Sequence, residues 1–246
     1  MTRFFIPSSQ INADSVILHG EDRHHLLHVL RKDVGAEITV LNGKGQEYLV
    51  RIAQINPESV TGTIIRPIER QTEPRVKLTL VQSLPKADKF EWIIQKNTEI
   101  GVSRFLPVQT ERSAVRFDPS ALPKKSERWR KIIREAAEQS GRQIIPELMP
   151  LAGWREVLAQ LPKGLVLIPW EGERNRSLQA VLQDNHEPAE NISVLIGPEG
   201  GFSLTEVDLA RQHGAQPVTL GPRILRTETA GLVVSAAILY HYGDLG

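Results

Sequence analysis

Three short apolar runs in the second half of the chain each end in a loop containing glycine or proline. They are GLVLIPWEG (164–172), NISVLIGPEGG (191–201) and QPVTLGPRIL (216–225). Such runs are typical of strands that are buried on both faces of a parallel sheet. Helical patterns separate them, and this alternation predicts an α/β domain. Because ligands bind beyond the carboxyl ends of parallel strands, we expect the three loops to form the functional site.

The alternation of strands and helices begins after Pro74. Strands are expected at 76–84 and 103–110, and helices at 86–101, 124–141, 154–162, 203–214 and 227–243. Gly101 and Gly141 are placed to end two of these helices. Ser203 and Glu206 have the spacing of a capping box at the start of another. Residues 73–246 are therefore predicted to form the α/β domain.

Residues 1–72 are predicted to form a separate small β domain, a barrel or a sandwich. β-branched, partly alternating runs at 37–42, 47–55 and 59–68 are separated by turn sequences. A short helix is expected over 21–31, where three leucines share one side. The polar segment 68–76 resembles a linker.

Composition excludes several kinds of chemistry. The sequence of 246 residues has no cysteine, which excludes disulfides, thiolate catalysis and cysteine-bound metal centres. The N-terminus lacks the apolar core of a signal peptide, and no apolar run is long enough to span a membrane, so a cytoplasmic location is expected. His24, His25 and His28 invite a metal interpretation, but the His-Glu-x-x-His motif is absent, and we predict no metal site.

The distribution of charge is more informative than the net charge of +1. Residues 124–142 hold seven basic and three acidic side chains, a local charge of +4. This pattern fits either a solvated helix face or a surface that binds nucleic acid phosphates.

Trp92 and Trp129 lie at helical core spacing, and both are interpreted as packing residues.

The glycine-rich loops do not match the common phosphate loops. The Walker lysine and the G-x-G-x-x-G pattern are both absent, and Glu199 would repel a pyrophosphate. Gly200 and Gly201 permit close approach of the backbone to a ligand. A neutral or cationic ligand is easier to place here, and Ile224 and Leu225 would pack against a ring such as adenine. Taken alone, either loop also fits an ordinary tight turn.

As a pair, LIGPEGGFS and LGPRILRTETA resemble the cofactor-binding knot of the SPOUT methyltransferases. Within that superfamily the chain resembles the RsmE-type enzymes, which methylate a uridine N3 in small-subunit (16S) ribosomal RNA. RFF, HHLLHVLR, QKNTEIGV and RW…EAAEQSGR extend the resemblance over nearly the whole chain. It implies a PUA-like β-barrel that binds RNA at 1–72 and a trefoil-knotted α/β domain at 73–246. It also implies S-adenosylmethionine as donor, free ribosomal RNA or the 30S subunit as substrate, and a homodimer with each active site near the subunit interface.

The resemblance also suggests roles for individual residues. The cofactor pocket is expected to be lined by Pro169, Ile196, Gly197, Pro198, Gly200, Gly201, Leu220, Gly221, Ile224, Leu225, Arg226 and Ala230. RNA contacts are expected at Arg3, Arg23, His25, Arg31, Lys32, Arg130, Arg134, Gln139 and Arg142.

Three residues are the catalytic candidates. Arg226 can stabilise a uridine oxyanion, and either Glu199 or Glu228 can accept the N3 proton. The alternative roles are a structural salt bridge for Arg226 and helix capping for Glu228. Two other functions stay open: methylation of another RNA position or a ribose 2′-hydroxyl, and a non-catalytic assembly factor that binds ribosomal RNA.

Overall fold

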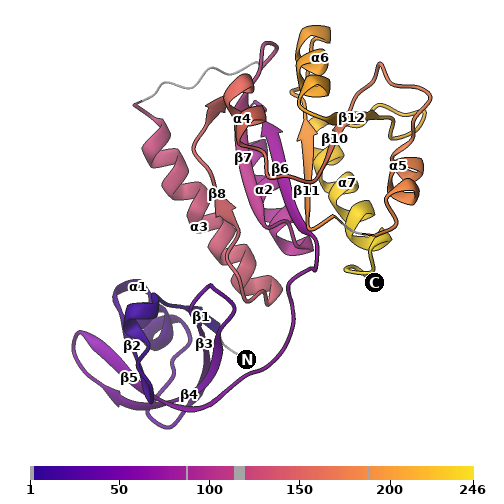
Figure 1. Ribbon diagram of the computed structural model, residues 1–246. Helices are drawn as coiled ribbons and strands as arrows, with labels where there is room; N and C mark the ends of the chain where they lie inside the picture. The colour runs from indigo at the N-terminus through magenta and orange to yellow at the C-terminus, as the bar shows by residue number, and fades with distance from the viewer. Residues whose placement is uncertain (1–2, 87, 114–119, 188) are drawn as a thin grey trace. The chain divides into compact units, whose positions relative to one another are not determined.

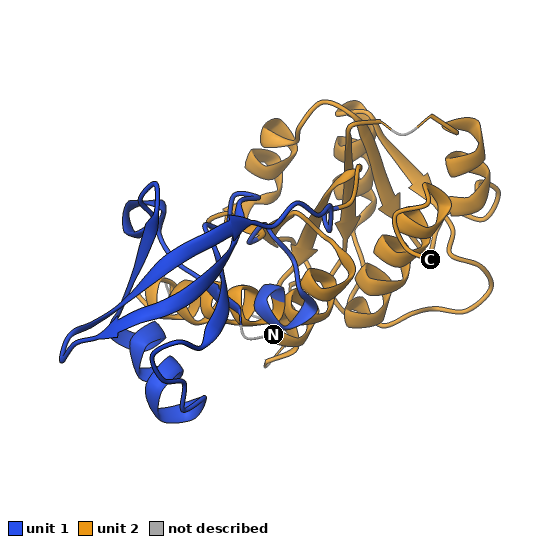
Figure 2. Cartoon of the chain, turned by 90° about the horizontal axis from the view of Figure 1, so that it is seen from below, with its two compact units in different colours: residues 1–73, 137–145 blue, residues 74–136, 146–246 orange. Residues whose placement is uncertain are grey.

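The computed structural model describes residues 3–86, 88–113, 120–187 and 189–246. The chain divides into two compact units (Figure 2). Unit 1 comprises residues 1–73 with 137–145, and unit 2 comprises residues 74–136 with 146–246. A small β unit followed by an α/β unit confirms the predicted fold class. The prediction did not include 137–145 in the first unit, and the domain boundary at 72/73 stays a prediction.

Unit 1 contains a curled five-stranded sheet with the strand order β1-β3-β4-β5-β2 (Figure 1). The strands are β1 (Arg3–Phe5), β2 (Ser15–His19), β3 (Glu37–Leu41), β4 (Glu47–Ile55) and β5 (Ser59–Pro67). Strands β1 and β3 are parallel, and the other neighbouring pairs are antiparallel. Alternate side chains such as Val16 and Leu18 point inward and are fully buried in one core. This sheet confirms the predicted small β domain.

The segment predicted as a helix over 21–31 has a less regular structure. Helix α1 (Gly20–His24) continues into a π-helical turn, η2 (His25–Val29), which buries Leu26. Arg31 then has a φ of 49°, in the left-handed region, and the helical segment ends there. A short 3-10 turn, η1 (Ser8–Gln10), precedes these elements.

Unit 2 is built on a parallel sheet with the order β12-β10-β11-β6-β7-β8, and β9 also pairs with β7. The strands are β6 (Lys77–Ser83), β7 (Arg104–Gln109), β8 (Glu147–Leu148), β9 (Ala152–Gly153), β10 (Leu165–Pro169), β11 (Asn191–Ile196) and β12 (Ala215–Val218). Every strand pair described in this sheet is parallel, as predicted. Because β6 and β11 lie in the middle, their side chains are buried on both faces, which explains their continuous apolar runs.

Helices cover both faces of this sheet. They are α2 (Lys89–Ile100), α3 (Leu122–Ser140), α4 (Trp154–Gln160), α5 (Leu178–Asp184), α6 (Leu204–Gln212) and α7 (Thr227–His241). Helices α2 and α7 pack against each other, and α7 contacts β6 and β11. Helices α4 and α6 share a core with the other face of the sheet, where the rings of Trp154 and Phe202 lie 4.9 Å apart. Helix α5 was not predicted, and the knot implied by the resemblance stays a prediction.

Local signals at the helix ends were interpreted correctly, but one core assignment is wrong. Gly101 and Gly141 have φ angles of 119° and 78° just after α2 and α3, and Ser203 and Glu206 form the expected capping box. Trp129 is buried against Phe90, with ring centroids 4.6 Å apart.

Trp92, in contrast, is 42% exposed, so its predicted packing role is wrong. The buried face of α2 follows Phe90, Ile93, Ile94 and Asn97. Trp92 is two positions from Phe90, about 200° around the helix, and therefore faces away from the core.

Within the described ranges, each helix falls short of the length and apolar character that a membrane crossing requires.

Candidate functional site

Two adjoining cavities lie at the carboxyl ends of β10, β11 and β12. Their volumes are about 600 and 500 Å³, and both are lined by Pro169, Glu171, Ile224, Leu225 and Ala230. The loop after β12 lines the larger cavity, and the loop after β11 lines the smaller one together with the first residues of α7. This is the sheet edge at which the parallel topology places a ligand.

The structure brings together all the residues that were predicted to bind the cofactor. The smaller cavity is lined by Ile196, Gly197, Pro198, Gly200, Gly201 and Arg226, the larger one by Leu220 and Gly221, and both by the remaining four, Pro169, Ile224, Leu225 and Ala230. Their individual roles stay predictions. Two glycines adopt the left-handed backbone that the turns require, with φ angles of 68° at Gly201 and 102° at Gly221.

A buried hydrogen-bond chain connects the loop after β11 to the start of α7. The Thr227 hydroxyl donates to the Gly197 carbonyl oxygen at 2.6 Å, and it accepts a hydrogen bond from Gln82 Nε2 at 2.9 Å. Gln82 Nε2 also donates to the carbonyl oxygen of Ser83, at 2.9 Å. Gln82 and Thr227 are buried, so this chain fixes the start of α7 against the ends of β6 and β11. Gln82 was not among the residues predicted for the site, because its sequence context indicates only a strand.

A lysine bridges the two carboxylates that were proposed as proton acceptors. Lys89 Nζ lies 3.2 Å from Glu228 Oε1 and 3.7 Å from Glu199 Oε1. The Lys86 backbone amide also donates to Glu199 Oε1, at 3.1 Å. Lys89, Glu199 and Glu228 all line the smaller cavity. No motif in the sequence indicated Lys89.

The surroundings of Glu228 favour its ionised form. Partial burial acts to raise the pKa of this carboxyl, but its own backbone amide, the Lys89 ammonium and the Arg226 charge together lower the pKa. Glu228 lies in the first turn of α7, where the helix dipole also favours a negative charge. Arg226 is the N-cap residue of α7; it is exposed and lines the same cavity.

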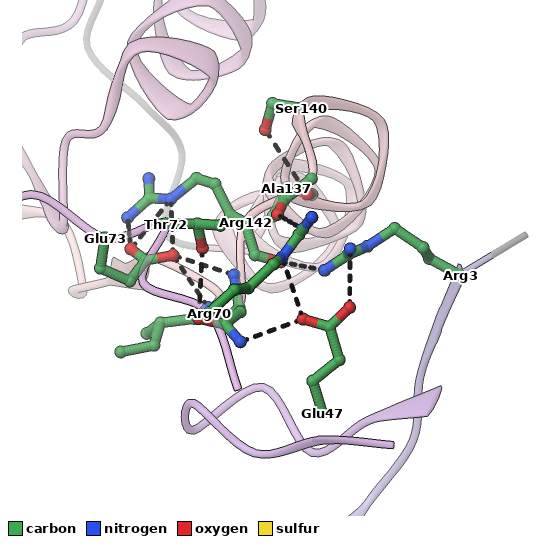
Figure 3. Close-up of polar contacts among 11 residues, drawn as sticks. Arg3, Glu47, Arg70, Thr72, Glu73, Ala137, Ser140 and Arg142 are labelled. Atoms are coloured by element: carbon green, nitrogen blue, oxygen red, sulfur yellow. Dashed lines mark hydrogen bonds and ion pairs between the residues drawn. The ribbon is translucent and has the colours of Figure 1, made fainter. Parts of the chain in front are cut away.

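Two of the arginines predicted to bind RNA instead hold unit 1 together (Figure 3). Arg142 is 3% exposed and pairs with Glu73 at 2.6 Å, and Glu73 also accepts from the backbone amide of Gln143 at 2.9 Å. Arg3 pairs with the buried Glu47 at 2.9 Å, and burial lowers the pKa of its guanidinium although Glu47 counteracts this effect. These contacts argue against phosphate binding by Arg3 and Arg142, because both guanidinium groups already form ion pairs with carboxylates inside unit 1.

The segment expected to be a linker takes part in the same network. Arg70 pairs with Glu47 at 3.3 Å, and Glu73 binds three successive residues through Arg142 and the amides of Gln143 and Ile144. Residues 70–73 therefore attach the segment after α3 to the sheet of unit 1 (Figure 3).

The other residues predicted to bind RNA differ in how accessible they are. The Arg23 guanidinium donates to the Asn56 carbonyl at 3.0 Å, and the His25 ring meets Phe4 edge-on at 5.8 Å. Arg31 is exposed and Lys32 is half-buried. On α3, Arg130 and Gln139 are exposed and Arg134 is half-buried. No group of three or more histidine, aspartate or glutamate side chains in the described part of the chain is arranged to hold a metal ion.

Family models match most of the chain. A model of an RNA methyltransferase domain matches residues 72–239, and a model of an RNA methyltransferase PUA domain matches residues 18–65. Ribosomal RNA small subunit methyltransferase E of Bacillus subtilis (strain 168) is 34% identical over 247 residues, covering 98% of this chain and 96% of the relative. The protein of the same name from Synechocystis is 36% identical over 239 residues, covering 96% of this chain and 76% of the relative.

Solved structures agree with these matches. A crystal structure of a ribosomal RNA small subunit methyltransferase E from Neisseria gonorrhoeae, bound to S-adenosyl methionine, has a TM-score of 0.86 and 32% identity, with coverage of 98% of this chain and 97% of that one. A putative methyltransferase from Legionella pneumophila, in complex with the bound cofactor SAM, has the same TM-score and identity, with 98% of both chains covered.

Proposed function

Because the chain belongs to the RNA methyltransferase family of the ribosomal RNA small subunit methyltransferases E, we propose that it transfers a methyl group from S-adenosylmethionine to N3 of a uridine in small-subunit ribosomal RNA. The observation that carries this proposal is the convergence of the two glycine-containing loops on one pair of cavities, of which the smaller is lined by three carboxylates and two cations.

The residues of the cavities fit this cofactor. Three carboxylates, Glu171, Glu199 and Glu228, outnumber the two cations, Lys89 and Arg226, in the lining of the smaller cavity, which suits a ligand that carries a sulfonium cation and no phosphate. Ile224 and Leu225 offer apolar surface for an adenine ring, next to backbone groups exposed by the glycines. Bound there, S-adenosylmethionine would supply an electrophilic methyl carbon.

The chain's own residues would manage the proton and the charge of the uridine. The N3 proton must leave for the nitrogen electron pair to form the new bond to the methyl carbon, and Glu199 or Glu228 can accept it. The bond between that carbon and the donor sulfur would break at the same time, and its electron pair would return to the sulfur, which leaves as a neutral thioether. Arg226 can stabilise the negative charge that develops on the uridine oxygens. The pKa of Glu228 lies below its ordinary value, so its carboxylate is ionised at neutral pH.

Product analysis tests this function. We expect 3-methyluridine when the protein and S-adenosylmethionine are incubated with 16S RNA or with assembled 30S subunits, followed by nucleoside mass spectrometry. Parallel reactions with the two substrates show which form of the RNA is methylated. A 2′-O-methyl product would contradict the proposed atom. Donor binding without any methylated product would instead support the assembly-factor alternative.

We also propose that the exposed face of α3 binds RNA phosphates. Lys124, Arg128, Arg130 and Lys131 are exposed along this helix. Such a row of cations suits a polyanion, and binding that depends on it weakens as the salt concentration rises. The polar and charged outer face thus contrasts with the buried side of the helix, which carries Trp129.

A second copy of the chain is the proposed occupant of an apolar groove along α7. The groove has a volume of about 900 Å³, and its lining includes Val233, Tyr240 and Leu245, which are 43%, 72% and 37% exposed. Exposed apolar side chains gathered in one groove are typical of an interface. Leu220 and Gly221 line both this groove and the larger cavity, so a subunit bound here would complete the edge of the cofactor site.

Replacing Tyr240 with glutamate is expected to produce a monomer, because the charge would be buried without a partner in the proposed interface. Donor affinity should fall with it, since the groove and the cavity share lining residues. Analytical ultracentrifugation and calorimetry measure the two effects. Leu204→Glu is the matched control, because Leu204 is 66% exposed on α6 and lies outside the groove lining. A wild-type protein that sediments as a monomer would contradict the dimer.

A further inference from the structure

Lys89 occupies an unusual position for a basic residue. It is the first residue of α2, where the unpaired backbone amides and the helix dipole favour a negative side chain. The acidic residue of this turn, Glu91, pairs with Arg128 at 2.6 Å. The lysine therefore opposes the local preference of its own helix. A departure of this kind is expected at functional positions, where another interaction compensates for it.

The compensating interaction comes from the cofactor loops. Glu199 belongs to the loop after β11, and Glu228 belongs to the first turn of α7, so the two carboxylates come from separate elements. Lys89 Nζ lies within 3.4 Å of both Glu228 oxygens and 3.7 Å from Glu199 Oε1. Without a cation between them, the two negative charges would repel each other.

We propose that Lys89 is a positioning residue of the methyl-transfer site, which holds the Glu199 and Glu228 carboxylates close together at the edge of the cofactor cavity. The inference rests on the proposed function. Lys89 does not itself exchange a proton with the substrate. Its ammonium balances one of the two carboxylate charges, so that the proton acceptor is ionised and correctly oriented when the uridine N3–H arrives.

Helix α2 also connects this lysine to the core. Lys89 is 34% exposed at its side chain, whereas its neighbour Phe90 is buried against Trp129. The backbone of the lysine is thus fixed by packing, and its flexible side chain reaches the two carboxylates. Removing only the charged end should leave α2 folded, since the packing partners of the helix are unchanged.

The test compares Lys89→Met, Lys89→Arg and the control Lys96→Met, which lies on the same helix and loses an ion pair with Glu99. We expect Lys89→Met to lower kcat about 10–100-fold, the range associated with a misplaced proton acceptor. KM for both substrates should change little, and the acidic limb of the kcat–pH profile should move to higher pH. Lys89→Arg should restore most of the rate, and Lys96→Met should behave as wild type.

A measurement without turnover separates this inference from the proposed function. Carboxyl ¹³C NMR of the protein alone, assigned with Glu199→Gln and Glu228→Gln, should show the Glu228 titration midpoint at higher pH in Lys89→Met. Thermal unfolding should shift by no more than about 2 °C, as for a partly exposed ion pair. An unchanged midpoint and pH profile in Lys89→Met would overturn the positioning role. An inactive wild-type protein with the shifted midpoint would overturn the proposed function alone.

Discussion

Replacing Gly201 with valine will weaken S-adenosylmethionine binding at least about 100-fold, the equivalent of roughly 2.7 kcal/mol. Gly201 has a φ of 68°, which costs a β-branched residue about 1–3 kcal/mol. A Cβ atom there would lie 2.5 Å from Glu171 Oε1, so the Glu171 carboxylate must also move. Both residues line the smaller cavity, and relief of either conflict changes the shape of the proposed cofactor site. Isothermal calorimetry measures the loss.

Gly214→Val provides the matched control for this prediction. Gly214 has a similar φ of 85°, has no atom within 4 Å of an added Cβ, and lies outside the lining of both cavities. It should lose stability by about 1–3 kcal/mol through backbone strain and keep its donor affinity. Equal binding losses in the two variants would indicate a general effect of strain and would contradict the role of the Gly201 loop.

The arrangement of the cofactor loops could be predicted because the physics that places them is local. Buried parallel strands have continuous apolar runs, and their carboxyl ends meet at one edge of the sheet. The loops that contain Gly197 and Gly221 were therefore expected at one edge of the sheet, and the structure has both of them lining the cavities there. The capping box of Ser203 and Glu206 is local in the same sense, and the structure contains it.

Lys89 and Gln82 could not be predicted in this way. Each gains its role from a partner more than 100 residues away, as in the contacts of Lys89 with Glu228 and of Gln82 with Thr227. Their own neighbours in sequence carry no sign of these contacts. Trp92 is an error of a different kind. It was predicted to pack in the core, but it lies on the exposed side of α2. Helical periodicity fixes which residues share a face, and Trp92 does not share the face of Phe90 and Ile93.

The attachment of residues 137–145 to unit 1 could not be predicted from the sequence, for a related reason. The basic stretch at 124–142 was interpreted as one surface because its charges are adjacent in sequence. In the structure, Arg142 belongs to unit 1 and forms an ion pair with Glu73, 69 residues earlier in the chain. A guanidinium is equally suited to a phosphate and to a carboxylate, so only the fold distinguishes the two uses.

Replacing Arg142 with methionine should therefore destabilise unit 1 by about 3 kcal/mol, because it leaves the Glu73 carboxylate in a largely buried position without its cation. The Arg142 and Glu73 side chains are only 4% and 19% exposed, and their contact of 2.6 Å joins the segment after α3 to residues 70–73. Hydrogen exchange at the amides of β1 and β4, followed in the full chain, reports the stability of this unit.

Arg128→Met distinguishes a buried ion pair from an exposed one. Arg128 contacts Glu91 at the same 2.6 Å, but its side chain is 64% exposed, so its loss should cost less than about 1 kcal/mol. In RNA binding, by contrast, Arg128→Met should have the larger effect and Arg142→Met the smaller one. Loss of the exposed Arg128 should reduce the salt dependence of RNA binding by about one phosphate contact, whereas loss of Arg142 should leave that dependence unchanged. A normal exchange pattern with a reduced salt dependence in Arg142→Met would restore the original interpretation of Arg142 as an RNA contact.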